Sequence, residues 1–197
     1  MIKRVFDIIF SFLGLLILSP VFLIIALMIK ITSDGPVFYR GKRIGKGGKP
    51  LRIFKFRTMV LNADKIGGPS TAADDPRLTK IGNFLKKYQL DELPQLINVL
   101  KGEMSLVGPR PEVEMYVNMM NNEERNTILS VRPGMTDWAS LWNFHEGETL
   151  KGSEDPEKAY MEKIRPEKLR LQIKYVKESN FWTDIKIIFE TIAKIFK

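Results

Sequence analysis

Two adjacent carboxylates, Asp91 and Glu92, are the side chains in this sequence best placed to do chemistry. They lie in the run Gln-Leu-Asp-Glu-Leu-Pro-Gln-Leu at 89–96, where a helix can begin because proline is tolerated in the first helical turn. Asp91 would then lie near the positive end of that helix, where its ionised form is favoured. Such a carboxylate beside a phosphate could serve as a metal ligand or a nucleophile. The alternative is an ordinary N-cap followed by an acid in the first turn.

A basic segment precedes the carboxylates. From 40 to 57 there are eight basic residues and no acidic one. We expect a β-hairpin over 37–57, because two strand-like stretches flank a glycine-rich turn at 45–48. The glycines do not form a Walker loop, since no Gly-Lys-Ser/Thr follows them at the required spacing. The hairpin is interpreted as a patch facing a phosphate or lipid headgroups, with a solvated basic surface as the alternative.

Two arginines lie in rigid loops. Proline on both sides of Arg110 restricts the backbone there, and a preorganised arginine suits bidentate binding of a phosphate. Arg132 precedes a Pro-Gly turn and repeats the pattern. The alternative at both positions is a structural ion pair, for Arg110 with a nearby acid such as Glu112.

The composition excludes several classes of protein. The chain has 197 residues and no cysteine, so disulfide scaffolds, thiolate metal sites and thiol nucleophiles are excluded. His145 is the single histidine, which excludes a multi-histidine metal site, and we assign it no chemistry. The net charge of +8 indicates an anionic partner, and on charge alone nucleic acid, anionic lipid and phosphorylated small molecules all qualify.

An apolar segment near the N-terminus indicates a membrane. Residues 8–29 are 22 consecutive uncharged residues, long enough as a helix to cross a hydrocarbon core of ~30 Å. Ser19 and Pro20 interrupt the run near its middle, where proline removes a helical hydrogen bond. Lysine and arginine flank the run on both sides, as is typical of cytoplasmic flanks. We expect a helix that enters, bends at Ser19-Pro20 and returns to the same side; a kinked transmembrane helix is the alternative.

The remaining residues predict helices. An amphipathic segment follows Asp75, and a short helix follows the carboxylates and ends near Gly102. The long pattern from Pro166 onward fits two helices broken near Ser179-Asn180, interfacial or packed on a core. The predicted fold class is α+β and predominantly helical, with an N-terminal re-entrant membrane helix hairpin, a small β-hairpin and interfacial amphipathic helices. The expected domains are residues 1–33, a membrane helix-break-helix, and 34–197, a cytoplasmic catalytic domain that forms one compact unit with it.

Taken in order, these segments resemble the small monotopic phosphoglycosyl transferases, bacterial sugar transferases that start lipid-linked glycan assembly. The likeness covers nearly the whole chain, and the ordered set is specific although each motif alone is weak. The break at Ser19-Pro20 lies where that family has its re-entrant kink. The matching segments are 55–59 (Lys-Phe-Arg-Thr-Met), 75–79 (Asp-Pro-Arg-Leu-Thr), 91–96, 104–111 and 132–136.

The resemblance implies a ping-pong phosphoglycosyl transfer. Asp91 would attack the β-phosphate of a UDP-sugar and expel UMP, and the phosphate of a polyprenol carrier, undecaprenyl phosphate, would then take the sugar phosphate from the enzyme. The family uses Mg²⁺, which would lie beside Asp91 and Glu92, with Glu92 orienting the metal or the incoming phosphate. We choose Lys55, Arg57 and Arg110 as diphosphate contacts and Arg132 as a further substrate contact. The implied location is the cytoplasmic face of the bacterial inner membrane, in exopolysaccharide or other glycan biosynthesis.

Some features depart from the family or leave a question open. Many relatives carry arginine just upstream of the dyad, where this chain has Lys86-Lys87-Tyr88, and a lysine keeps the charge but loses the planar fork. The segment 138–147 also differs from the relatives, and no residue identifies the sugar. The competing hypothesis is a non-enzymatic basic membrane-surface module that recruits an acidic partner. No nucleic-acid motif is present, and the oligomeric state is left open between a monomer and a homo-oligomer.

Overall fold

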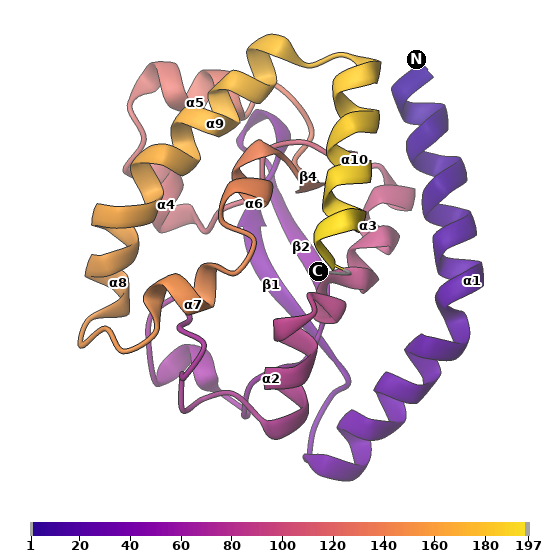
Figure 1. Cartoon of the computed structure of the whole chain (residues 1–197), viewed down its shortest axis with the longest axis vertical. Helices are drawn as coiled ribbons and strands as arrows, with labels where there is room; N and C mark the ends of the chain where they lie inside the picture. Colours follow the sequence, from indigo (N-terminus) through magenta and orange to yellow (C-terminus); the bar gives the residue numbers. More distant parts are fainter. Residues whose placement is uncertain (1, 196–197) are drawn as a thin grey trace.

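The computed structural model describes residues 2–195, of which the greater part is helical, at 60%. Figure 1 shows the long N-terminal helix α1 along one side of a body of shorter helices, with a β-hairpin behind them. The helices are α1 (Ile2–Thr32), α2 (Lys80–Lys87), α3 (Leu96–Lys101), α4 (Glu114–Asn118), α5 (Asn122–Ile128), α6 (Trp138–Trp142), α7 (Glu146–Leu150), α8 (Pro156–Ala159), α9 (Arg165–Glu178) and α10 (Phe181–Ile195). The strands are β1 (Phe38–Ile44), β2 (Pro50–Phe56), β3 (Ser105–Val107) and β4 (Gly134–Thr136).

The predicted β-hairpin is confirmed. β1 and β2 pair antiparallel, with Phe38 opposite Phe56 and Ile44 opposite Pro50. Between the strands, Gly47 has a φ of 66°, a left-handed conformation that glycine adopts without steric cost. Leu51 and Ile53 of β2 are buried, as expected for alternate residues on the core side of a strand, and Phe56 is buried at its end. The hairpin therefore packs one side of β2 against the helices.

A parallel strand pair, β3 with β4, lies beside the hairpin, and the sequence did not predict it. Ser105 pairs with Gly134 and Val107 with Thr136. The backbones approach closely at Gly108 and Gly134, because a Cβ on Gly134 would lie 2.0 Å from Gly108 N. This pairing fixes the start of the loop that carries Arg110.

α1 is one continuous helical segment with Pro20 inside it. The Ser19 hydroxyl donates to the Leu16 carbonyl at 2.8 Å, which satisfies backbone polarity one turn before the proline. Figure 1 shows the axis of the ribbon changing direction between its two halves. The predicted interruption is therefore a bend within one helix, not a helix-break-helix. Within residues 2–195, α1 is the helix long and apolar enough to cross a membrane.

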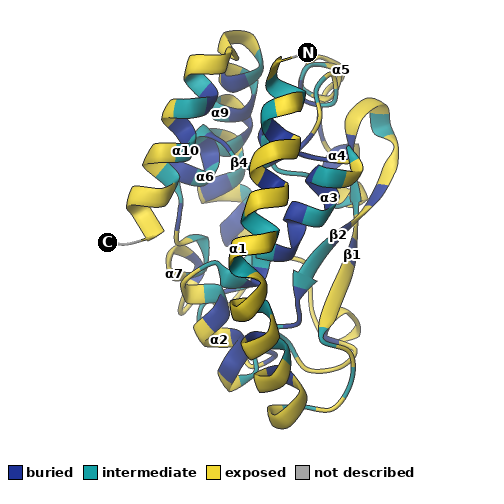
Figure 2. Cartoon of the chain, turned by 90° about the vertical axis from the view of Figure 1, so that its right-hand side faces the viewer, coloured by how far each residue is buried: buried dark blue, intermediate teal, exposed yellow. Residues whose placement is uncertain are grey.

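Both ends of α1 pack against the same body. Near its C-terminal end, Ile25 and Ile29 join a core cluster with Phe56 of β2 and Leu85 of α2. Near its N-terminal end, the buried Asp7 contacts β3. The opposite face is apolar and exposed, as Figure 2 shows by the yellow stripe along α1.

The two predicted C-terminal helices are confirmed as α9 and α10, which are separated at Ser179-Asn180. One face of each is packed: Tyr175 of α9 and Ile187 of α10 are buried with Val107 and Leu141 in a shared cluster. The other face of α10 is exposed and includes Trp182 and Phe189. The core-packing interpretation is therefore confirmed for one face, and the interfacial interpretation stays a prediction for the exposed face of α10.

Candidate active site

The carboxylate pair lies on a 3-10 helix, Leu90–Gln95, that continues directly into α3. The residue before it, Gln89, has a φ of 54°, and its side-chain amide donates to the Phe144 carbonyl at 2.7 Å. Asp91 is the second residue of this helix, so the N-cap interpretation is wrong. The bound Gln89 side chain stabilises the strained turn that brings Asp91 to the cleft.

Two cations hold Glu92. Arg110 donates to both carboxylate oxygens, from Nη1 to Oε2 at 2.6 Å and from Nη2 to Oε1. Lys55 Nζ donates to Glu92 Oε1 at 2.7 Å and lies 3.8 Å from Asp91 Oδ2. The structure therefore brings together four of the predicted site residues, Lys55, Asp91, Glu92 and Arg110, from three separate segments. Their arrangement is a buried carboxylate pair neutralised by two basic groups.

The two carboxylates have opposite electrostatics. Burial raises the pKa of Asp91 to about 6; Lys55 opposes the rise and Glu92 adds to it. For Glu92 burial also acts upward, but Arg110 and Lys55 outweigh it and hold the pKa of that carboxyl far below its usual range. The sequence-based expectation of a low pKa at Asp91 is wrong, because desolvation exceeds any benefit of the helix end. Asp91 remains ionised at neutral pH, but the nearby charge of Lys55 does not fully offset the cost of burying the carboxylate. An anion in this condition is a good candidate nucleophile.

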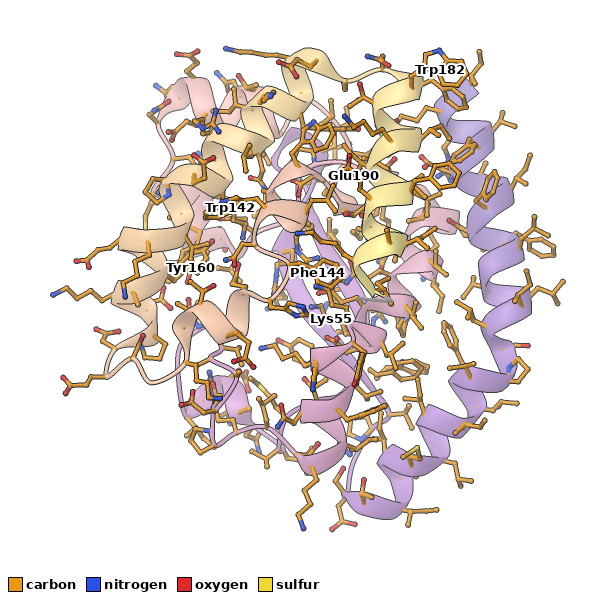
Figure 3. The ribbon with its side chains drawn as sticks, in the orientation of Figure 1. Lys55, Trp142, Phe144, Tyr160, Trp182 and Glu190 are labelled. Carbon is orange, nitrogen blue, oxygen red and sulfur yellow. The ribbon has the colours of Figure 1, made fainter. Side chains whose placement is uncertain are left out.

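An open cleft of about 670 Å³ gives access to the pair. Lys55, Asp91 and Arg110 line it on one side, and the α6–α7 segment lines it on another with Trp142 and His145. Figure 3 labels Lys55, Phe144 and Trp142, which are among the residues that line the cleft. A cleft of this size accommodates a small-molecule substrate.

Lys86 of α2 also lines the cleft. Burial lowers its pKa to about 8, and the neighbouring charge of Lys55 lowers it further, while Asp91 opposes the fall. Its ammonium donates to the Thr71 carbonyl at 3.5 Å. The sequence indicated this position only through its departure from relatives that carry arginine. The structure places a second lysine, besides Lys55, within reach of an anion in the cleft.

The far wall of the cleft is a polar group that sequence reasoning missed. Lys168 Nζ pairs with Glu112 at 3.0 Å and donates to the Tyr160 hydroxyl at 3.0 Å. The alternative interpretation, an ion pair between Arg110 and Glu112, is wrong in its partner, because Arg110 pairs with Glu92 and Glu112 pairs with Lys168. Tyr160 begins a π-helical turn, Tyr160–Ile164, a geometry that is frequent at functional sites. The wide π-helical turn is the one local feature that could have indicated this group of residues, and no sequence pattern predicts such a turn.

Arg57 does not lie in the cleft. It is buried, and its guanidinium donates to the carbonyl of Ser33 at 3.0 Å and to that of Asp34. These carbonyls directly follow α1, so Arg57 satisfies backbone groups at the end of the apolar helix. Its position is that of a structural arginine.

Arg132 is also outside the cleft. Its side chain is exposed, and Nε donates to the Gly102 carbonyl at 2.9 Å, beyond the end of α3. The loops before Arg110 and Arg132 look alike in the sequence. Yet the parallel pairing of β3 with β4 turns only Arg110 toward Glu92.

The residues that could hold a metal ion are few. Over residues 2–195 there is no group of three or more His, Asp or Glu side chains arranged to enclose a metal ion. Both oxygens of Glu92 are engaged by Arg110, whereas Asp91 Oδ2 has Lys55 only at 3.8 Å. Mg²⁺ is commonly held by one or two carboxylates together with substrate phosphates. The donor set therefore fits a Mg²⁺ ion that arrives with a diphosphate substrate and is held by Asp91.

This combination of a paired carboxylate, clustered basic residues and an apolar helix agrees with comparison to known proteins. The whole chain, residues 1–197, matches the family described as bacterial sugar transferase. The chain belongs to that family. The resemblance found in the sequence motifs is thereby confirmed.

Individual relatives share much of the sequence. The chain is 43% identical over 204 residues to the UDP-glucose:undecaprenyl-phosphate glucose-1-phosphate transferase of Escherichia coli, covering 100% of this chain and 40% of that protein. It is 35% identical to the UDP-N-acetylgalactosamine-undecaprenyl-phosphate N-acetylgalactosaminephosphotransferase of Aeromonas hydrophila, covering 98% of this chain and 43% of the relative. It therefore spans less than half the length of these two relatives. It matches 94% of the exopolysaccharide production protein PSS of Rhizobium leguminosarum, at 39% identity.

Proposed function

We propose that this chain transfers a sugar 1-phosphate from a UDP-sugar to a polyprenyl phosphate, of the undecaprenyl type, and releases UMP. The observation that carries the proposal is the buried Asp91, with a raised pKa, beside a Glu92 that Arg110 and Lys55 neutralise, all facing one cleft. The Escherichia coli and Aeromonas hydrophila relatives share undecaprenyl phosphate but differ in the sugar, which is glucose in the first and N-acetylgalactosamine in the second. The proposal therefore includes the carrier and leaves the sugar unassigned.

In the first step, an Asp91 carboxylate oxygen forms a bond to the β-phosphorus of the UDP-sugar. The bond from that phosphorus to the oxygen bridging the α-phosphate breaks, and UMP leaves with the electron pair. In the second step, a phosphate oxygen of the polyprenyl phosphate attacks the same phosphorus and Asp91 leaves as a carboxylate. The first step uses the Asp91 carboxylate and the second step restores it, so the enzyme is unchanged after one turnover.

The basic residues supply positioning and charge, which phosphoryl transfer mainly asks of a protein. Lys55 contacts both carboxylates. Its ammonium can therefore stabilise the negative charge first on Asp91 and then on the oxygens of the phosphoryl group being transferred. Arg110 holds Glu92 in place through two parallel hydrogen bonds. Glu92, in turn, keeps Arg110 and Lys55 at the cleft when no substrate is bound.

Mg²⁺ is proposed as the cofactor, held by Asp91 and substrate phosphates, with Glu92 adjacent. When bound, the ion would neutralise charge on the diphosphate and its leaving group. Its removal is directly testable. We expect EDTA to abolish UMP release and added Mg²⁺ to restore it.

The membrane arrangement is proposed to be monotopic, at the cytoplasmic face of the inner membrane. Both ends of α1 contact one body, so a bilayer cannot separate the two ends without also enclosing that body. The exposed apolar face of α1 and the exposed Trp182 and Phe189 of α10 offer surfaces to lipid. A re-entrant α1 that bends near Pro20 accounts for these features together, and it places the cleft near lipid phosphates.

A UMP-release assay with polyprenyl phosphate, Mg²⁺ and a panel of UDP-sugars tests the proposal. We expect UMP from at least one donor, and a loss of at least ~10³-fold with Asp91→Asn. Asp64→Asn, a change of the same type on a 3-10 helix outside the cleft, is the matched control. Release of UDP instead would indicate an ordinary glycosyl transfer. Activity that survives Asp91→Asn, with a dependence on the basic hairpin alone, would favour the recruiting module.

A further inference from the structure

The first two turns of α1 carry three charged side chains, Lys3, Arg4 and Asp7, that face the protein. In the sequence, Lys3 and Arg4 have the position of headgroup-facing residues beside an apolar run. In the structure each donates to groups of the catalytic body. Asp7 is 3% exposed and directly precedes the apolar run of the helix. A charge so buried is costly unless it is well paired, and Asp7 has such partners.

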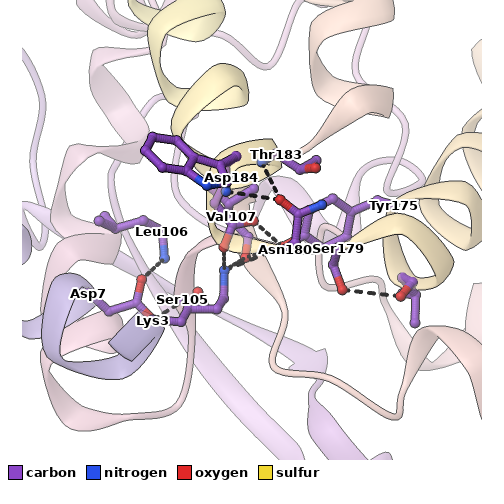
Figure 4. Close-up of polar contacts among 12 residues, drawn as sticks. Lys3, Asp7, Ser105, Leu106, Val107, Tyr175, Ser179, Asn180, Thr183 and Asp184 are labelled. Atoms are coloured by element: carbon purple, nitrogen blue, oxygen red, sulfur yellow. Dashed lines mark hydrogen bonds and ion pairs between the residues drawn. The ribbon is translucent and has the colours of Figure 1, made fainter. Parts of the chain in front are cut away.

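Asp7 binds β3 directly. Its Oδ1 accepts from the Leu106 backbone amide at 3.0 Å and its Oδ2 from the Ser105 hydroxyl at 2.9 Å. Figure 4 shows these two contacts between α1 and the strand. Two contacts to successive residues therefore fix both the distance between α1 and β3 and the position of β3 along the axis of α1.

Lys3 binds the same strand one residue further along. Its ammonium donates to the Val107 carbonyl at 2.9 Å and pairs with Asp184 Oδ2 of α10 at 2.5 Å. Tyr175 of α9 completes the group: its hydroxyl donates to Asp184 Oδ1 at 2.7 Å and also lies 3.2 Å from the Val107 carbonyl oxygen. Figure 4 shows Lys3, Tyr175 and Asp184 close to Val107. Side chains of α1 and α9 thus reach one carbonyl, and Asp184 of α10 accepts hydrogen bonds from both of them.

Arg4 binds the other element of the site. Its guanidinium donates to the carbonyls of Val99 at 2.6 Å and Leu100 at 3.0 Å, at the C-terminal end of α3. A cation there also complements the helix dipole. α3 continues from the 3-10 helix of Asp91 and Glu92, and Val107 lies three residues before Arg110 in a loop stiffened by two prolines. The N-terminal end of α1 therefore contacts both segments that position the Arg110–Glu92 pair: β3, which leads to Arg110, and α3, which follows Glu92.

We propose that Lys3 and Asp7 are positioning residues, which register the membrane helix against β3 and thereby hold Arg110 on Glu92. This inference rests on the proposed function. The competing explanation is that Lys3 acts on lipid headgroups through its charge alone. The geometry favours positioning, because the Lys3 ammonium has three protein acceptors and Asp7 carries the wrong charge for an anionic surface. A contact of this kind sets catalytic geometry, in which a misplacement of ~1 Å can cost ~100-fold in rate.

The kinetic test compares Asp7→Ala, which removes both acceptor oxygens, and Lys3→Gln with Lys30→Gln in UMP release from vesicle-reconstituted protein. Lys30→Gln removes the same charge from the exposed far end of the apolar run. We expect kcat to fall ~10-fold or more for the first two variants, with KM for the UDP-sugar within about threefold, and the control to keep its rate. Lys3→Arg, which keeps the ion pair, should restore most of kcat. Equal losses in Lys3→Gln and Lys30→Gln would overturn the proposal in favour of a headgroup effect.

Hydrogen exchange tests the same inference without relying on turnover. The Leu106 amide is protected by an oxygen of Asp7 itself, so Asp7→Ala, which removes both acceptor oxygens, should speed exchange at least fivefold in peptides covering 104–112, while peptides covering β1 and β2 stay protected. Lys30→Gln should leave 104–112 unchanged. Unchanged exchange at 104–112 in Asp7→Ala would overturn the inference even if the enzyme is active. If wild-type protein releases no UMP but the exchange changes as expected, the proposed function fails and the registration stands.

Discussion

Asp91 is a residue whose environment favours its neutral form while the proposed chemistry needs its charge. Burial raises its pKa to about 6, so a protonated Asp91 predominates below that pH and cannot attack phosphorus. We expect kcat/KM for UMP release to rise with pH through a midpoint near 6 and to level off above it. A pH series with a saturating carrier measures this. A midpoint near 4 would contradict the buried environment of Asp91.

The same burial makes Asp91 costly for stability. Its folded pKa lies above the ordinary value of 3.8, so its contribution to stability is complete below about pH 4 and is lost as pH rises through about 6. Asp91→Asn should therefore stabilise the protein at pH 8, by on the order of 2–3 kcal/mol, and have little effect at pH 4. Denaturant unfolding in EDTA at both pH values measures this. Destabilisation at pH 8 would show that Asp91 is well paired.

Arg110 is distinguished from Arg132 by its geometry. Arg110→Lys keeps the charge but loses the bidentate contact with Glu92. We expect UMP release to fall by ~10- to 100-fold. Arg132→Lys, at a single exposed contact with Gly102, should change the rate less than about twofold. Similar losses in both variants would mean that the sequence-based assignment of Arg132 to the substrate was correct.

At the scale of residues, the sequence indicated the four side chains that meet at the site, because each belongs to a motif of the ordered set that resembles the family. It did not separate them from Arg57 and Arg132, which share their residue type and local context. Whether an arginine reaches a cleft or a helix end depends on contacts with residues far away in the chain, such as Arg57 with Ser33 and Asp34. Lys168 and Glu112 of the far wall are 56 positions apart and no local pattern links them.

At the scale of elements, long apolar or alternating segments were predictable and short strands were not. The hairpin of β1 and β2 and the division of α9 from α10 follow from local patterns. β3 and β4 have three residues each and pair in parallel across an intervening pair of helices, and short strands depend on tertiary packing rather than on propensity. α1 contains the proline at which an interruption was expected, but it is one helical segment from Ile2 to Thr32, and the Ser19 hydroxyl binds the Leu16 carbonyl that the proline leaves without a donor.

The close approach of β3 and β4 gives a prediction for the elements. A Cβ at Gly134 would lie 2.0 Å from Gly108 N and 2.5 Å from Gly108 O, so the two backbones must separate. We expect Gly134→Ala to destabilise the fold by more than ~3 kcal/mol and to lower UMP release through displaced Arg110. Thermal unfolding and kinetics measure both effects. Gly152→Ala is a control for glycine replacement, because its Cβ would meet nothing within 4 Å and only its backbone, at a φ of 70°, would be strained.

Arg57 also acts between elements. Its buried guanidinium satisfies the carbonyls that follow α1, so Arg57→Met leaves them without a donor and removes a charged partner. We expect a loss of stability of ~1–3 kcal/mol. The rate per folded molecule should stay within about threefold of wild type. A large loss of rate in a stable Arg57→Met protein would instead place Arg57 in contact with the substrate.

At the scale of the whole molecule, the exposed apolar face of α1 and the position of both its ends predict a monotopic topology. The chain has no cysteine, so single cysteines introduced at Ile2 and Thr32 report each end cleanly. We expect neither to react with an impermeant maleimide added to intact spheroplasts, and both to react after permeabilisation. Labelling of one end alone in intact spheroplasts would show that α1 spans the bilayer.

A covalent intermediate at Asp91 is the central claim, and the mass of the protein after exposure to donor alone tests it most directly. With a reactive UDP-sugar, Mg²⁺ and no polyprenyl phosphate, we predict an added mass of one sugar phosphate, mapped to the peptide that contains Asp91. The adduct should disappear when the carrier is added and should not form in Asp91→Asn. Full turnover with no adduct at Asp91, under conditions quenched within a single turnover, would contradict the account.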